Sequence, residues 1–84
     1  MNQVSQATTL DQLNFGQLAT VTALNVAGAN RRRLMDLGIL PGTQLAVDLK
    51  SPLGDPTAYR IRGAVIALRR EQAKQIEITL EVQS

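Results

Sequence analysis

The segment from Arg31 to Gly42 restricts the backbone more tightly than any other part of the chain. Gly38 stands where a helix would end in the left-handed conformation, which a residue without a Cβ adopts at little cost. Ile39 would then fold back on Leu34, the hydrophobic contact that accompanies this kind of cap. Leu40-Pro41-Gly42-Thr43 has the composition of a type II turn, with proline second and glycine third. The segment predicts a short helix that turns sharply into a strand.

The predicted helix covers about residues 29–37. Leu34 and Leu37, with Met35 beside them, form an apolar stripe that is expected to face the core. Asn30 or a residue near it is expected to cap the N-terminus by accepting a backbone hydrogen bond.

The same helix carries three consecutive arginines in its first turns: Arg31, Arg32 and Arg33. The helix dipole disfavours cations there by roughly a few tenths of a kcal/mol, so helix stability does not explain them. They are either a solvated helix face, an electrostatic contact for an acidic protein surface, or contacts to a nucleic acid backbone. Arg60 and Arg62, on the exterior of a later strand, would extend such a basic patch.

The remainder of the chain alternates between apolar and polar residues as strands do. We expect about five strands, which suit a small, mostly antiparallel barrel, near residues 18–24, 43–50, 57–62, 64–68 and 76–82. A bulge is expected between Val21 and Leu24, and the inward positions of the second strand are Leu45, Val47 and Leu49. The near-continuous apolarity of 64–68 predicts a strand partly covered on both faces. A second helical turn is expected at about 69–75.

The fold class is therefore mostly β: a small barrel with one short helix and one helical turn. Residues 1–9 are polar and are expected to form a flexible lead, and 10–84 form a single domain. Leu10, Leu13 and Phe15 supply the apolar anchors at the entry to this domain.

The composition argues against an enzyme. The chain has no cysteine and no histidine, which removes the thiol nucleophile, the commonest general base and the commonest transition-metal ligand. The carboxylates are scattered over different elements. We therefore expect no catalytic residue, no metal site and no cofactor. No apolar run approaches the ~20 residues that cross a bilayer, and the polar start is not a secretory signal, so a cytoplasmic location is expected.

The charge and the aromatic content limit the partners. The net charge is only +2 and the aromatic residues are Phe15 and Tyr59. Nucleic acid binding is not expected, because it relies on phosphate contacts and stacking aromatics. A groove for proline-rich peptides, which aromatics line, is equally hard to build.

The loop from Pro52 to Pro56 contains two prolines and a glycine. Proline limits the entropy that the loop loses on ordering, so the loop can be a stiff arm. Leu53 at its tip is either folded back onto the connector or presented to a partner as a hydrophobic knob.

Three segments, taken in order, resemble the FeoA family: 33–42, 52–56 and 68–73 with Ile76 beyond. The likeness covers roughly residues 10–82. It implies an SH3-like β-barrel and a cytosolic accessory protein of bacterial ferrous iron uptake. The implied partner is the FeoB membrane transporter, which has a cytosolic GTP-binding domain. The same barrel occurs at the C-terminus of iron-dependent repressors, so the alternative is a regulatory domain acting in metal-responsive transcription.

Under the leading hypothesis, the chain docks on the transporter and modulates its transport or GTPase activity, staying at the inner face of the membrane when bound. The expected contact residues are Arg32, Arg33, Leu53, Asp55 and Arg69. The residues expected to shape this surface from beneath are Leu34, Leu37, Gly38, Pro41, Gly42, Pro52, Gly54 and Pro56. Exposed barrel edges also allow self-association.

Overall fold

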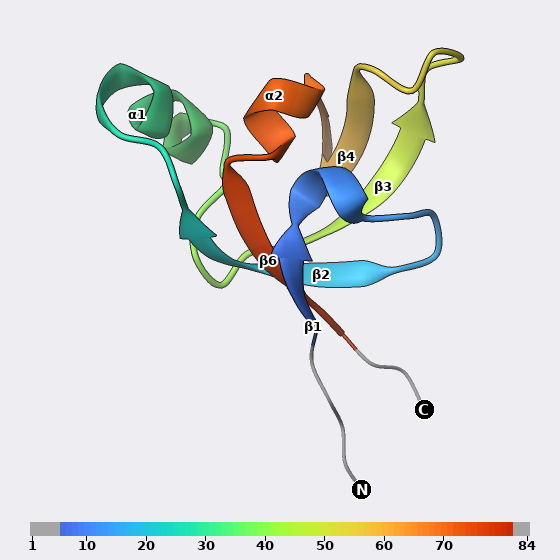
Figure 1. Ribbon diagram of the computed structural model, residues 1–84, viewed down its shortest axis with the longest axis horizontal. Coiled ribbons are helices and arrows are strands. Elements are labelled where there is room, and N and C mark those ends of the chain that lie inside the picture. Colours follow the sequence, from blue (N-terminus) through green and yellow to red (C-terminus); the bar gives the residue numbers. More distant parts are fainter. Residues whose placement is uncertain (1–5, 82–84) are drawn as a thin grey trace, which may run out of the picture.

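The structure is a computed structural model of the chain and describes residues 6–81. In chain order the elements are β1 (Gln6–Thr9), the 3-10 helix η1 (Leu10–Gln12), β2 (Leu18–Leu24), α1 (Gly28–Asp36), β3 (Gln44–Lys50), β4 (Thr57–Ile61), β5 (Ala64–Leu68), α2 (Arg70–Ala73) and β6 (Ile76–Leu80). The strands form one antiparallel sheet in the order β1-β6-β2-β3-β4-β5. Figure 1 shows the sheet strongly curved, with α1, α2 and the β3–β4 loop at one end.

The predicted mostly β barrel with α1 and α2 is confirmed, but the described residues form six strands, not five. The additional strand is β1, which pairs with β6 from Gln6 opposite Leu80 to Thr9 opposite Glu77. The expectation of a flexible lead was therefore wrong for residues 6–9, and residues 1–5 lie outside the described chain. Polar residues can form this strand because the hydrogen bonds of the sheet satisfy their backbone groups. Leu10, which follows directly and is 0% exposed, anchors the segment in the core.

The core lies inside the curved sheet and consists almost wholly of aliphatic side chains. Its buried hydrophobic members are Leu10, Leu13, Ala19, Val21, Leu24, Leu34, Ile39, Leu45, Val47, Tyr59, Ile61, Leu68, Ala73, Ile76 and Ile78. The expected anchors Leu10 and Leu13 are thus confirmed, whereas Phe15 is 56% exposed. The alternation of β4 is also confirmed, since Tyr59 and Ile61 are buried while Arg60 and Arg62 are exposed.

Two register shifts decide which strand residues face the core. The shift between Val21 and Ala23 in β2 confirms the expected bulge. A second shift, between Val47 and Leu49 in β3, was not expected. A bulge inserts one residue and reverses the alternation beyond it. Leu49 is therefore 62% exposed, and its predicted inward position was wrong.

The fifth strand, β5, is an edge strand of the sheet and pairs only with β4 among the described strands. Its residues Ala64, Val65 and Ala67 are exposed, and only Leu68 is buried. The prediction that this strand is partly covered on both faces was wrong, because Val65 and Ala67 on one face are both exposed. An apolar run is typical of a strand in a sheet that is covered on both faces. The strand order places β5 at the sheet edge, and an apolar run does not encode strand order.

The end of α1 is closed as the sequence predicts. The N–H of Gly38 donates to the carbonyl of Met35 at 2.9 Å, and the N–H of Ile39 donates to that of Leu34 at 3.1 Å. This is the Schellman pattern, and Gly38 has the positive φ of 95° that it requires. Leu34 and Ile39 are both buried, which contributes about 1.5–3 kcal/mol for each side chain.

The expected turn after α1 is observed, whereas the expected N-terminal cap and apolar stripe of α1 are not. The type II turn is confirmed, since the N–H of Thr43 donates to the carbonyl of Leu40 at 2.9 Å and Gly42 has a φ of 95°. The expected cap was wrong: α1 begins at Gly28, no side chain caps it, and Asn30 lies inside the helix. Leu37 and Met35 are each 37% exposed, so the apolar stripe reduces to Leu34.

Replacing Gly38 by alanine tests the helix stop. A Cβ at this position would meet only a methyl of Ile61 at 4.0 Å, so the cost is the left-handed backbone and not a clash. We expect Gly38→Ala to lower the free energy of unfolding by about 1–2 kcal/mol, measured by urea denaturation. Gly38→Asn is the matched control and should lose less, because asparagine tolerates this conformation. Equal losses for the two variants would contradict the strain argument.

The single tyrosine of the chain, Tyr59, is a buried core residue whose hydroxyl donates to the carbonyl of Leu10 at 3.5 Å. Burial raises the pKa of Tyr59, the hydrogen bond with Thr57 lowers it, and the negative charges of Asp11 and Asp55 raise it further. Because the folded pKa lies above the unfolded value of about 10, the neutral phenol supports the fold below that pH. This support is lost as the pH rises through the folded pKa.

Alkaline titration of the folded protein, followed by phenolate absorbance, should therefore give an apparent pKa above that of the urea-denatured chain. The free energy of unfolding should fall with rising pH above about 10. Tyr59→Phe is the control that removes both the signal and this part of the pH dependence. A folded titration that coincides with the denatured one would contradict the burial of this hydroxyl.

Candidate docking face

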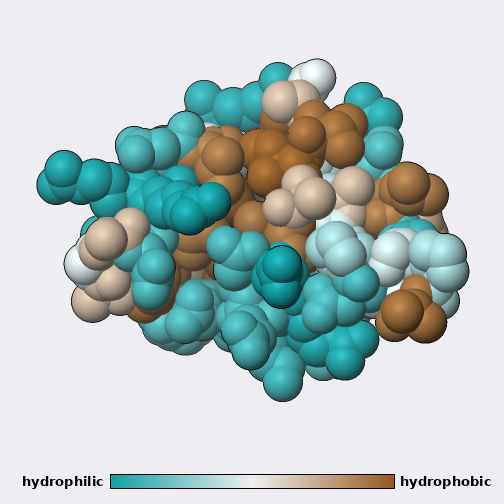
Figure 2. Space-filling model, turned by 90° about the horizontal axis from the view of Figure 1, so that it is seen from above, coloured by the Kyte–Doolittle hydropathy of each residue, from teal (hydrophilic) through white to brown (hydrophobic). Residues whose placement is uncertain are grey.

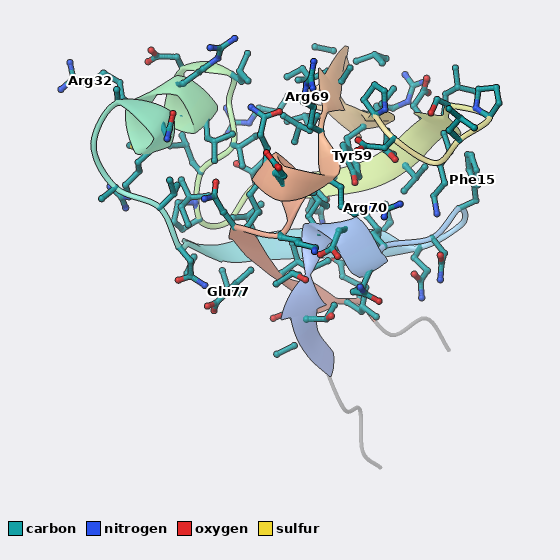
Figure 3. All side chains as sticks on the ribbon, turned by 45° about the horizontal axis from the view of Figure 1, so that its top comes forward. Phe15, Arg32, Tyr59, Arg69, Arg70 and Glu77 are labelled. Atoms are coloured by element: carbon teal, nitrogen blue, oxygen red, sulfur yellow. The ribbon has the colours of Figure 1, made fainter. Side chains whose placement is uncertain are left out.

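The face under consideration, called here the upper face, is the end of the molecule formed by α1, α2 and the β3–β4 loop at residues 51–56. Figure 2 looks down on it and shows hydrophobic surface in the middle and at one side, with a hydrophilic protrusion at the other side. In Figure 3 Arg32 lies at the α1 end and Arg69 lies between α1 and the loop. The upper face thus combines basic and apolar surface.

The helix α1 presents its arginines outward because a single buried residue, Leu34, attaches it to the core. Arg31, Arg32 and Arg33 are all exposed. In Figure 3 Arg32 points away from the rest of the molecule. With Gly28, Arg31, Met35 and Asp36 it borders an open hollow on the outer side of the helix.

Arg33 points toward the other side of α1 and lines a groove of about 240 Å³ between α1 and α2. The other residues around this groove are Asn30, Leu34, Glu71, Gln72 and Gln75. Arg33 and Glu71, of opposite charge, therefore border one groove from two helices. Sequence reasoning named Arg33 but missed Glu71, which lies far along the chain and carries no local signal for this proximity.

The β3–β4 loop is held in shape by its own backbone. The N–H of Gly54 donates to the carbonyl of Ser51 at 2.8 Å, and the N–H of Ser51 donates to that of Pro56 at 3.3 Å. At the tip of this braced loop the side chain of Leu53 is 89% exposed. Of the two readings of Leu53, folded back or presented outward, the structure has the second.

The same loop is joined to α2 through Asp55. Its carboxylate Oδ1 accepts a hydrogen bond of 2.9 Å from the backbone N–H of Arg70, the first residue of α2. A carboxylate at the start of a helix satisfies an unpaired donor and faces the positive end of the helix dipole. Asp55 was expected as a partner contact, and its observed bond makes it a brace between the loop and α2. The sequence signal was weak, because donor and acceptor are separated by a whole hairpin.

Arg69 stands directly before α2 with an exposed side chain. Its backbone N–H donates to Oε1 of Gln72 at 3.0 Å, which fixes the backbone where the chain leaves β5. The guanidinium of Arg70 lies against Gly54, where a Cβ would come within 3.5 Å of its nitrogen. This contact between Arg70 and the loop comes from the tertiary fold.

The expected site residues thus fall into separate groups. Arg33 borders the groove between α1 and α2, Asp55 joins the loop to α2, and Arg69 lies between α1 and the loop. Leu53 is almost fully exposed on the loop, and Arg32 points away from the rest of the molecule in Figure 3. The upper face is one surface with α2 at its centre.

The upper face offers exposed charged and apolar side chains for contacts. In residues 6–81 no three histidine, cysteine, aspartate or glutamate side chains come together as metal ligands would. Among the carboxylates of the same residues, Asp48 is engaged by Arg60 at 2.6 Å, and Oε2 of Glu81 accepts bonds from Thr20 and Gln44. Across the described part of the chain, no helix has the length and apolar character that crossing a membrane needs.

The comparisons with known proteins agree with this fold. The sequence model of the FeoA domain matches residues 8–80. The Fe(2+) transport protein A/Fe(2+) transporter FeoB fusion protein of Porphyromonas gingivalis is 35% identical over 71 residues, which cover 84% of this chain and 8% of that protein. The chain therefore spans less than a tenth of the length of this curated relative.

Solved structures show the same likeness. The NMR structure of a FeoA-like protein from Clostridium acetobutylicum has a TM-score of 0.84 at 30% identity, covering 96% of this chain and 94% of that one. The crystal structure of FeoA from Stenotrophomonas maltophilia, described as an SH3 domain protein complexed with zinc, has a TM-score of 0.74 at 28% identity, covering 84% and 88%. A manganese-dependent transcriptional repressor shares the fold at a TM-score of 0.79 but only 21% identity.

The predicted SH3-like barrel is thus the fold of these proteins, and the three motif segments lie within the matched region. Since the family model matches nearly all of the described residues, this chain belongs to the FeoA family.

Proposed function

We propose that this chain is an accessory protein of ferrous iron uptake that docks on the cytosolic part of a FeoB-type membrane transporter and modulates its transport or GTPase activity. The observation that carries the proposal is the Porphyromonas gingivalis relative, whose name joins transport protein A and the transporter FeoB in a single fusion protein. Joining two proteins in one chain raises their effective concentration for each other, which is useful when the two act together. The proposal places this chain in the cytoplasm, at the inner face of the cell membrane when bound.

The upper face is the docking surface that we propose. Leu53 offers an exposed apolar side chain on a loop that its own backbone already holds, so little entropy is lost when a partner covers it. Interface energy concentrates in a few anchors that fill pockets on the partner. Leu53 is the anchor, and Arg32, Arg33 and Arg69 supply positive charge that attracts an acidic partner surface.

Asp55 has an indirect part in this proposal. Its bond to the start of α2 holds the loop and the helix in fixed relation, so that Leu53 and Arg69 approach a partner together. Proteins that present preformed surfaces lose less free energy in ordering themselves on binding.

The repressor alternative has weaker support. The likeness to the manganese-dependent repressor concerns the fold alone, and folds host many functions. The chain has no histidine and no cysteine, which weakens direct sensing of a transition metal. We therefore retain the transporter as the proposed partner.

Replacing Leu53 by aspartate tests the docking surface. We expect the wild-type chain to bind the full-length transporter in nanodiscs and Leu53→Asp to bind at least about tenfold more weakly, because the variant buries a charge where an apolar anchor stood. Biolayer interferometry measures the two affinities, with and without guanine nucleotide.

The matched control is Leu49→Asp, which alters a leucine that is 62% exposed on β3 and should leave the affinity within about twofold. GTP hydrolysis by the transporter, measured with and without this chain, then reports modulation. Absence of binding in every nucleotide state would contradict the proposal. Equal losses of affinity in the two leucine variants would contradict the upper face as the docking surface.

A further inference from the structure

The free edge of β5 is the strongest feature that the docking proposal leaves unused. The turn from β4 to β5 has two central residues, Arg62 and Gly63, with φ values of 52° and 82°. Two positive φ values define a type I′ turn, whose flanking residues form a hydrogen-bonded pair. Such pairs alternate with pairs that exchange no hydrogen bond. The register of β4 and β5 then gives Ile61/Ala64, Tyr59/Ile66 and Thr57/Leu68 as bonded pairs, and Arg60/Val65 and Ala58/Ala67 as unbonded pairs.

It follows that Val65 and Ala67 turn their backbone N–H and C=O groups away from β4 and toward the outer edge. In the described part of the chain, residues 64–68 make no backbone hydrogen bond outside the ladder with β4. The side chain of Val65 is 51% exposed and Ala67 is exposed as well. This edge carries neither a proline nor an inward-pointing charge, the usual devices that protect an edge strand from pairing.

Positive charge flanks the edge at both ends. Arg62 stands in the turn before β5 and Arg69 follows directly after it, and both side chains are exposed. Two carboxylates of the neighbouring strands and loop are engaged elsewhere, because Asp48 pairs with Arg60 and Asp55 bonds the start of α2. The edge is therefore an apolar strand with free backbone groups between two cations.

We propose that the free edge of β5 binds an extended acidic segment of another protein as an added β-strand. The backbone groups of Val65 and Ala67 would pair with the segment. Arg62 and Arg69 would attract carboxylates at its two ends. Main-chain bonds supply affinity in this mode of recognition, and side chains supply specificity. The interface is small, so an affinity on the order of micromolar to millimolar is expected.

Charge argues against a second copy of this chain as the occupant. Two β5 strands paired antiparallel would place Arg62 of each copy near Arg69 of the other. Like charges that meet across paired strands are unfavourable. The other free edge, β1, is a weaker candidate because its residues 6–9 are uncharged and the next charge along the chain is that of Asp11.

The inference is independent of the identity of the transporter, and its test uses a synthetic probe. The probe is a short peptide of alternating valine and glutamate with blocked ends, titrated into the ¹⁵N-labelled full chain. We expect saturable shifts of the Val65 and Ala67 amide resonances and slower hydrogen exchange at both. Arg62→Gln and Arg69→Gln should each weaken binding about two- to fivefold, and Arg31→Gln on α1 should change it less than about twofold.

Two further peptides separate backbone pairing from charge alone. The same peptide N-methylated at every amide keeps its carboxylates but cannot form strand hydrogen bonds, and it should not bind. The version with lysine in place of glutamate should bind at least about tenfold more weakly.

The outcomes that overturn the proposal are equally defined. They are no saturable shift at millimolar peptide, shifts confined to α1, or undiminished binding of the N-methylated peptide. Edge shifts that appear when the protein alone is concentrated would assign the edge to a second copy and overturn the acidic partner. Amide spectra of the variants, unchanged away from the substitution, confirm that each is folded.

Discussion

The backbone reversal at Gly38 is the constraint on which the upper half of this protein depends. The positive φ of this glycine ends α1 and sends Ile39 back into the core beside Leu34. Thr43 also stabilises this reversal, because its hydroxyl donates a hydrogen bond to the carbonyl of Gly38 at 3.3 Å. The following turn is then fixed to β2, since the N–H of Gly42 donates to the carbonyl of Val21 at 2.7 Å. One helix end thereby sets the position of α1 and the start of β3.

The upper face depends on a second connection, the bond between Asp55 and the start of α2. The loop and α2 belong to different parts of the chain, and this bond converts them into one surface. Leu53 can be almost fully exposed and still have a defined position because the loop beneath it is braced. The proposed docking surface and the proposed strand-binding edge meet at Arg69, where β5 ends and α2 begins.

The sequence predicted much of the fold because the local signals were strong. The glycine stop, the Pro-Gly turn and the alternation of β4 each depend on a few neighbouring residues, and each is confirmed. The failures share a cause that lies beyond local pattern. Leu49 is exposed because β3 contains a bulge set by its pairing with β4. Residues 6–9 are a strand because β6 offers them a partner, although their own composition is polar.

The site shows the same division. The exposed arginines on α1 were predictable, because charge is a property of the chain itself. The sequence left open whether Leu53 folds back, and the structure shows it exposed. The sequence alone therefore determined the helix stop, the turns, the aliphatic core and the lack of cysteine and histidine chemistry. Only the tertiary structure decided that Asp55 braces α2, that Arg33 shares a groove with Glu71, and that β5 lies at an edge. The physical reason is that these features depend on which strands pair, and pairing is a property of the whole sheet that no single segment encodes.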